Sequence, residues 1–77
     1  MNRVREIVAG VLGVPPSEIL TGSGPADFAQ WDSAAHIDIM LSLEAAYGVS
    51  FTARELAETL SIAGMEDALR QKGVRLG

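Results

Sequence analysis

Apolar residues recur at every third or fourth position along much of this chain, and that spacing restricts it to a helical fold. The first stretch shows the pattern with Val4, Ile7, Val8, Val11 and Leu12. Side chains spaced in this way share one face of an α-helix, and that face is stable only when other elements cover it. No stretch alternates apolar and polar residues as a half-buried strand does. The sequence therefore predicts a bundle of helices without a sheet.

Turn-forming residues mark where the first two helices end. Asn2 can cap the start of the first helix, and Gly13 with the prolines after it ends that helix, because proline lacks an N–H donor. The second helix is expected to run from about Ser33 to Tyr47 and to close at Gly48. A long, turn-rich connection lies between the two helices. Four of its apolar residues are expected to pin it to the core: Ile19, Leu20, Phe28 and Trp31.

The predicted second helix has two apolar faces. The larger face is expected to pack in the core and comprises His36, Ile39, Met40, Leu43, Ala46 and Tyr47. A smaller row consists of Ala34, Ile37 and Leu41, and it is interleaved with the acidic residues Asp32, Asp38 and Glu44. In a monomer this row would lie near solvent, where it forms a plausible docking spot for a partner protein. The alternative is that a third helix covers Ile37 and Leu41.

Two further helices are predicted from their capping residues. Thr52 and Glu55 have the S/T-x-x-E spacing of a capping box, which starts a short helix that continues through Leu56 and Leu60. Ser61 can cap a last helix that stops at Gly73. The inward residues of this last helix are Ile62, Met65, Ala68 and Leu69. We therefore expect an all-α fold, a small four-helix bundle of three main helices and one short helix, with its longest loop between the first and second.

The length of 77 residues, with 48% apolar content, allows one modest core, so residues 1–77 are expected to form a single domain. The chain has no cysteine, which excludes a disulfide framework and leaves any thiol chemistry to an added group. No cationic leader and no run of about 18 apolar residues is present, so a cytoplasmic location is the default expectation.

Acidic residues are concentrated in the middle of the chain. The net charge is −4, and between residues 17 and 67 nine acidic residues stand against a single basic one, Arg54. This balance argues against nucleic acid as the main partner. It would attract partner proteins with basic surfaces, although the simpler interpretation is that the charge only keeps the protein soluble.

An acidic residue followed by a hydroxyl, Asp32-Ser33, stands at the head of the predicted second helix. The first N–H groups of a helix and the positive end of its dipole attract anions, so a serine displayed there suits a phosphate ester.

With His36, the Asp32-Ser33 pair also supplies the residue types of a hydrolytic triad. In a triad the aspartate binds one histidine nitrogen and the serine meets the other, and adjacent residues at one helix end cannot easily satisfy both contacts. The sequence also has no glycine elbow and no oxyanion loop beside these residues. His36 is the only histidine, so a zinc site would need carboxylates to complete it. We expect no catalytic and no metal-binding residues, and a hydrogen-bonded His36 at the edge of the core.

The segment from Trp31 to Asp38, Trp-Asp-Ser-Ala-Ala-His-Ile-Asp, resembles the attachment region of acyl carrier and peptidyl carrier proteins. The order of the helices, the long loop and the short third helix extend the resemblance from Val4 to Leu69. It implies that Ser33 carries covalent 4′-phosphopantetheine and that Asp32 helps the modifying transferase and its metal to engage. It also implies partner contacts at Ala34, Ile37, Asp38, Leu41 and Glu44.

Ala35, Ala45 and Trp31 make the chain look more like a specialised, free-standing carrier than the housekeeping fatty-acid one, and two other differences from the family pattern bear on its modification by a generic transferase. Residues 29–31 are Ala-Gln-Trp where many members have a glycine, and Ala34 stands where they have a leucine. Ala35 and Ala45 occupy positions that are often acidic in fatty-acid carriers.

The sequence therefore predicts a monomeric, non-enzymatic carrier that holds a carboxylic acid or an amino acid as a thioester, in lipid or secondary metabolism. Its expected partners are a phosphopantetheinyl transferase and the enzymes that load and use the cargo through basic patches, with no role for nucleic acid or membrane. The competing prediction is an unmodified helical interaction module in which Ser33 only caps the helix.

Overall fold

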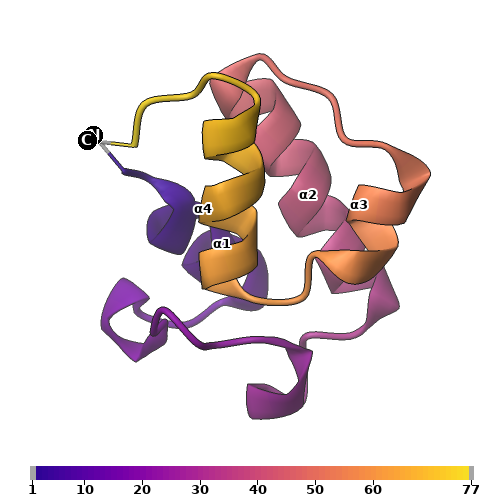
Figure 1. Cartoon of the computed structure of the whole chain (residues 1–77). Helices are drawn as coiled ribbons and strands as arrows, with labels where there is room; N and C mark the ends of the chain where they lie inside the picture. The colour runs from indigo at the N-terminus through magenta and orange to yellow at the C-terminus, as the bar shows by residue number, and fades with distance from the viewer. Residues whose placement is uncertain (1, 77) are drawn as a thin grey trace.

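The computed structural model describes residues 2–76, and over this range the chain is helical without strands. The four α-helices are α1 (Val4–Leu12), α2 (Ser33–Tyr47), α3 (Ala53–Glu58) and α4 (Ile62–Gln71). Two single 3-10 turns, η1 (Pro16–Glu18) and η2 (Pro25–Asp27), interrupt the connection between α1 and α2. Figure 1 shows α1, α2 and α4 packed together, with α3 at one side of the bundle. The predicted all-α bundle of three main helices and one short helix is confirmed.

Capping residues account for the helix boundaries. Glycines in the left-handed conformation follow α1 and α2, with φ of 73° at Gly13 and 65° at Gly48. The predicted capping box of α3 is present, because the Thr52 hydroxyl accepts the Glu55 N–H and the Glu55 carboxylate accepts the Thr52 N–H. At α1 the cap position is Arg3 rather than Asn2, although the Asn2 side chain still accepts the Val4 N–H at 3.0 Å.

The core lies where α1, α2 and α4 meet. Its largest fully buried side chains come from all three helices and from the long connection: Ile19, Ile39, Met40, Leu43, Ile62, Met65, Leu69, Val4 and Val8. The inward residues predicted for α4 are all buried. Burial of an aliphatic side chain of this size stabilises the fold by roughly 1.5–3 kcal/mol, so this apolar cluster is the main source of stability.

Two residues predicted in the core are exposed instead. Ala46 is predicted on the buried face of α2, but at about 100° per residue it lies roughly 70° round the helix from the centre of the four buried residues, and it is exposed. Leu20 is 63% exposed. It follows the fully buried Ile19, whose backbone is extended, and successive side chains of extended backbone point in opposite directions. Of the other predicted anchors of the connection, Trp31 is buried and Phe28 is half-buried.

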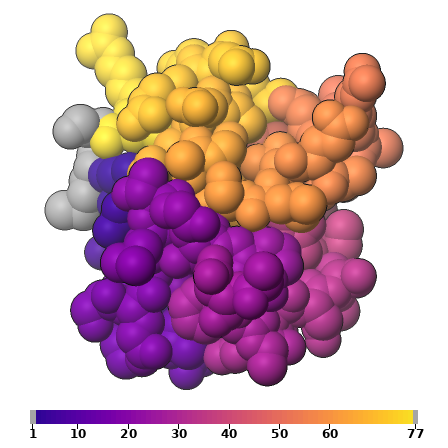
Figure 2. Space-filling view, turned by 60° about the horizontal axis from the view of Figure 1, so that its bottom comes forward, coloured from indigo at the N-terminus to yellow at the C-terminus, as the bar shows by residue number. Residues whose placement is uncertain are grey.

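The long connection is bonded to the start of α4. The Ile62 and Ala63 N–H groups donate to the carbonyls of Ser23 and Thr21, at 3.0 and 2.9 Å. Figure 2 shows the connection, in purple, spread over one face of the molecule next to α4 in gold. At Gly24 the two segments come so close that a Cβ atom would overlap the Leu60 carbonyl oxygen. Only glycine permits this approach, which holds the connection against the segment that joins α3 to α4.

We predict that Gly24→Ala destabilises the protein by roughly 1–3 kcal/mol, because the added methyl group must push backbone aside. Gly22→Ala is the matched control, since a Cβ at Gly22 meets nothing within 4 Å. Urea unfolding of both variants checks the prediction. Equal stability of the two variants would contradict it.

Candidate functional site

Ser33 is the first residue of α2 and is exposed. The cap of the helix is the residue before it, Asp32, whose carboxylate accepts the Ala35 N–H at 2.8 Å. No hydrogen bond between residues 2 and 76 involves the Ser33 hydroxyl. The alternative in which Ser33 caps the helix is therefore wrong in its structural premise, because Asp32 is the cap.

The backbone around Ser33 provides an electropositive setting. The first N–H groups of a helix have no partner inside the helix, and the aligned peptide dipoles place about half a positive charge at this end. Asp32 satisfies the N–H of Ala35, and its carbonyl accepts the N–H of His36 at 2.9 Å. The N–H groups of Ser33 and Ala34 come before those of Ala35 and His36 and lie at the very start of the helix. A phosphate ester on the Ser33 oxygen would lie beside them, which is the arrangement that helix N-termini offer to anions.

An open groove of about 610 Å³ lies beside Ser33 and is lined from both α2 and α3. Ile37 contributes to the α2 wall, and Leu56 and Leu60 contribute to the α3 side. The complete lining is Pro25, Trp31, Asp32, Ser33, His36, Ile37, Ala53, Leu56, Ala57 and Leu60. Apart from Asp32, Ser33 and His36, these residues are apolar. The groove therefore offers a mainly carbon-lined channel beside an exposed hydroxyl.

The smaller apolar row of α2 is exposed, as predicted. Ile37 is 42% and Leu41 50% exposed, and Ala34 also faces solvent. The alternative that a third helix covers Ile37 and Leu41 is wrong, because α3 leaves both exposed. Asp38, beside this row, is exposed as well.

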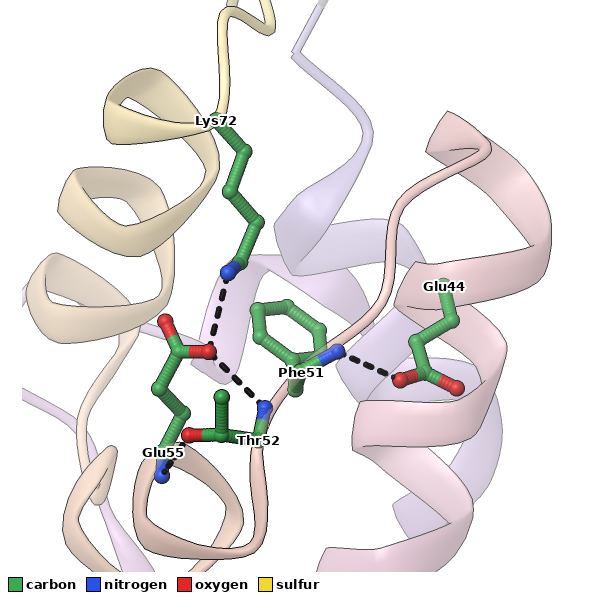
Figure 3. A network of polar contacts seen from close by, with 5 residues as sticks. All are labelled: Glu44, Phe51, Thr52, Glu55 and Lys72. Carbon is green, nitrogen blue, oxygen red and sulfur yellow. Dashed lines mark hydrogen bonds and ion pairs between the residues drawn. The ribbon is translucent and has the colours of Figure 1, made fainter.

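Glu44 differs from the other predicted partner contacts because it takes part in an internal hydrogen bond. Its side chain is half-buried. Its carboxylate accepts the Phe51 N–H (Figure 3), and the N–H nitrogen and the carboxylate oxygen are 2.7 Å apart. This bond ties the segment between α2 and α3 to the side of α2. The sequence pattern placed Glu44 with Asp38, but it held no signal for a backbone donor seven residues away.

His36 is buried, and both of its ring nitrogens are engaged. The Trp31 indole N–H donates to Nδ1 at 3.2 Å, and Nε2 lies 2.9 Å from the Leu56 carbonyl oxygen. The expected hydrogen-bonded histidine at the core edge is confirmed. Neither ring nitrogen is available to Ser33, and the Asp32 carboxylate is committed to the helix cap, so the three residues do not form a hydrolytic triad.

The described part of the chain contains no cluster of three or more His, Cys, Asp or Glu side chains that could hold a metal ion. A helix long and apolar enough to cross a membrane is likewise missing between residues 2 and 76.

A polar network anchors the N-terminal end of α3, next to the groove. Glu55 accepts hydrogen bonds from the Lys72 ammonium at 2.8 Å and from the Thr52 N–H at 2.9 Å, as drawn in Figure 3. The Lys72 ammonium also lies over the Phe51 ring, 5.4 Å from its centroid. The hydrogen bond from Lys72, followed by that from the Thr52 backbone, lowers the pKa of the Glu55 carboxyl below its ordinary value of 4.5.

The lowered pKa of Glu55 predicts a stability difference that depends on pH. A carboxyl whose pKa is lower in the folded state stabilises the fold above its unfolded pKa, and this contribution is lost as the pH falls through the folded pKa. Lys72→Met removes the main cause of the shift. We expect this variant to be less stable than the parent near neutral pH, with a difference that shrinks as the pH falls below 4.5.

Urea unfolding over this pH range tests the prediction. Arg70→Met is the control, because it breaks only the exposed pair with Asp67, at 3.5 Å, and should change stability little at any pH. A Lys72→Met difference that stays constant over the whole acid range would contradict the account.

Comparison with protein-family models adds one finding. Residues 2–69 match the family model described as phosphopantetheine attachment site. No curated protein matches the chain. The matched range contains all of α1, α2 and α3 and most of α4, with Ser33 near its middle.

Proposed function

Because the chain belongs to the phosphopantetheine attachment-site family, we propose that Ser33 is the serine on which it holds this group. Domains of this family are non-catalytic carriers that receive 4′-phosphopantetheine covalently on a serine. The observation that carries the assignment is the exposed Ser33 hydroxyl, which has no hydrogen-bond partner among residues 2–76 and lies at the start of a long helix.

Other serines lack this combination. Ser23 is buried and accepts the Leu20 N–H at 2.8 Å. Ser61 accepts the Gly64 N–H as the cap of α4. Ser42 lies in the middle of α2, where the N–H groups of the helix are already paired. Ser17 and Ser50 are exposed, but Ser17 lies in the single 3-10 turn η1 and Ser50 lies between α2 and α3, so neither begins a long helix. Ser33 therefore offers the best fit to a phosphate ester.

The bound group supplies a flexible arm with a terminal thiol, on which a cargo acid rides as a thioester. The chain supplies the attachment point and the surface that partner enzymes recognise. Asp32 keeps α2 capped up to the attachment point, and its carboxylate remains exposed to a cation brought by the modifying transferase. The apolar lining of the groove beside Ser33 supports an acyl cargo over a polar one, because burying an unpaired polar group there would cost free energy.

Shuttling between enzymes requires contacts that form and break quickly, and the exposed face of α2 suits this need. Ile37 and Leu41 are aliphatic anchors of modest area, and Asp38 adds a negative charge beside them. Small contacts with charged surroundings favour fast encounter over long residence. We propose that a phosphopantetheinyl transferase and the loading and cargo-using enzymes of a specialised pathway dock on this face through basic rims.

We predict that the arm is transferred to Ser33 alone. Ser33→Ala is expected to abolish transfer by a purified phosphopantetheinyl transferase and to leave the fold intact, because the exposed hydroxyl makes no bond within the described chain. Ser42→Ala, on the same helix, is the control and should be modified normally. Intact mass and circular dichroism give the two readouts. A modified Ser33→Ala protein would rule out the assignment.

The two acidic residues of α2 are predicted to behave differently. Asp38→Asn removes an exposed charge, so it should slow transfer at low salt by the equivalent of about 0.2–1 kcal/mol, and the deficit should shrink at high salt. Its unfolding transition should hardly move. Glu44→Gln weakens the bond to the Phe51 N–H and should lower stability by roughly 0.5–2 kcal/mol.

Transfer rates measured against salt concentration, together with thermal unfolding, test this distinction. Ile37→Ala and Leu41→Ala should slow transfer at all salt concentrations with little loss of stability, because both side chains are exposed. Transfer that is insensitive to Asp38, Ile37 and Leu41 would mean that this face is not where the transferase docks.

A further inference from the structure

α3 is the least embedded helix of the bundle. None of the residues Ala53–Glu58 is buried, whereas α1 and α2 each have four buried residues and α4 has five. A helix of six residues also has little stability of its own. Leu56 is half-buried and packs against the core, so polar contacts with the rest of the molecule add to a single apolar anchor in holding α3.

Three sets of contacts hold α3 or the segment that follows it. At its start, Glu55 is bonded to Lys72 across to the end of α4. Beyond its end, the long connection is bonded to the first residues of α4 and packs Gly24 on the Leu60 carbonyl. Between these two places, His36 of α2 reaches the Leu56 carbonyl at 2.9 Å. Of the three, only the His36 contact crosses the groove directly, because both residues belong to its lining.

The Trp31 indole determines which histidine nitrogen carries the proton. An indole N–H can only donate, so Nδ1 of His36 must accept from it and the ring proton must lie on Nε2. Nε2 is then a donor, and it donates to the Leu56 carbonyl. That carbonyl is in the last turn of α3, where carbonyl groups have no partner within the helix. The planes of the two rings are inclined by only 26° and their centroids are 6.2 Å apart, which fits a hydrogen bond between the edges of the rings.

We propose that His36 is a positioning residue, oriented by Trp31, that holds α3 at the Leu56 carbonyl as the second wall of the groove beside Ser33. The groove matters because of the proposed carrier function, so the inference rests on that function. The arrangement itself is a property of the unmodified chain. Its test therefore needs neither the arm nor a cargo.

Amide hydrogen exchange of the full unmodified chain, followed by NMR, tests the proposal. His36→Leu removes both hydrogen bonds with a side chain of similar size. The amides of Leu56 and Thr59, which are bonded within α3, should then exchange about 2- to 10-fold faster, relative to the amides of α1 and α4. The methyl resonances of Ile37 and Ala57, on the two sides of the groove, should shift. His36→Gln retains one acceptor and one donor and should restore part of the protection.

Two variants make the test specific. Glu58→Gln breaks only the exposed pair with Arg54 on the same helix and should leave exchange in α3 unchanged. Trp31→Phe keeps an aromatic ring but removes the indole donor, so it should also speed exchange in α3, and it decides the question if His36→Leu does not fold.

Unchanged exchange at Leu56 and Thr59, or equal acceleration in all four helices, would overturn the proposal. So would His36→Gln behaving like His36→Leu. Failure of Ser33 modification would leave these results untouched, and the reverse also holds, so the two hypotheses fail separately.

Discussion

The hydrogen bond between the Asp32 carboxylate and the Ala35 N–H is the contact on which the arrangement of the site depends. Because Asp32 caps α2, Ser33 enters the helix with its hydroxyl exposed and without a partner in the described chain. The regular turn of the helix then places His36 and Ile39 in the core and leaves Ile37 outside. A serine in the cap position would have committed its own oxygen to the backbone, and an attachment point there would compete with the start of the helix.

The groove beside Ser33 has two walls of different character. The α2 wall belongs to a long helix with four buried residues, whereas the α3 wall belongs to a short helix with none. At this second wall, the hydrogen bond to the Leu56 carbonyl and the ion pair of Glu55 with Lys72 add to the partial burial of Leu56. Polar contacts of this kind contribute little net stability each but are strict in geometry, so they suit an element whose position matters more than its stability.

Local sequence signals were sufficient for most of the fold. The bounds of α2, the capping box at Thr52, the cap at Ser61 and the exposed Ile37 and Leu41 follow from residues within a turn or two of one another. The sequence predictions that were wrong or incomplete concern contacts that helical periodicity does not describe. Leu20 lies outside because its buried neighbour took the inward position, and Glu44 is paired with a backbone group of the next loop. The contact of His36 with Leu56 spans 20 residues, and no periodicity in the sequence encodes such a pairing.

The central claim is that this chain carries phosphopantetheine on Ser33 in its own cell. Intact mass and fragmentation of the protein purified from its native host test it most directly, since they locate the modification and reveal any cargo together. The account predicts a single phosphopantetheine-bearing residue, Ser33, with or without an acyl group on the thiol. A protein that is isolated wholly unmodified, or that bears the group on another serine, would contradict it.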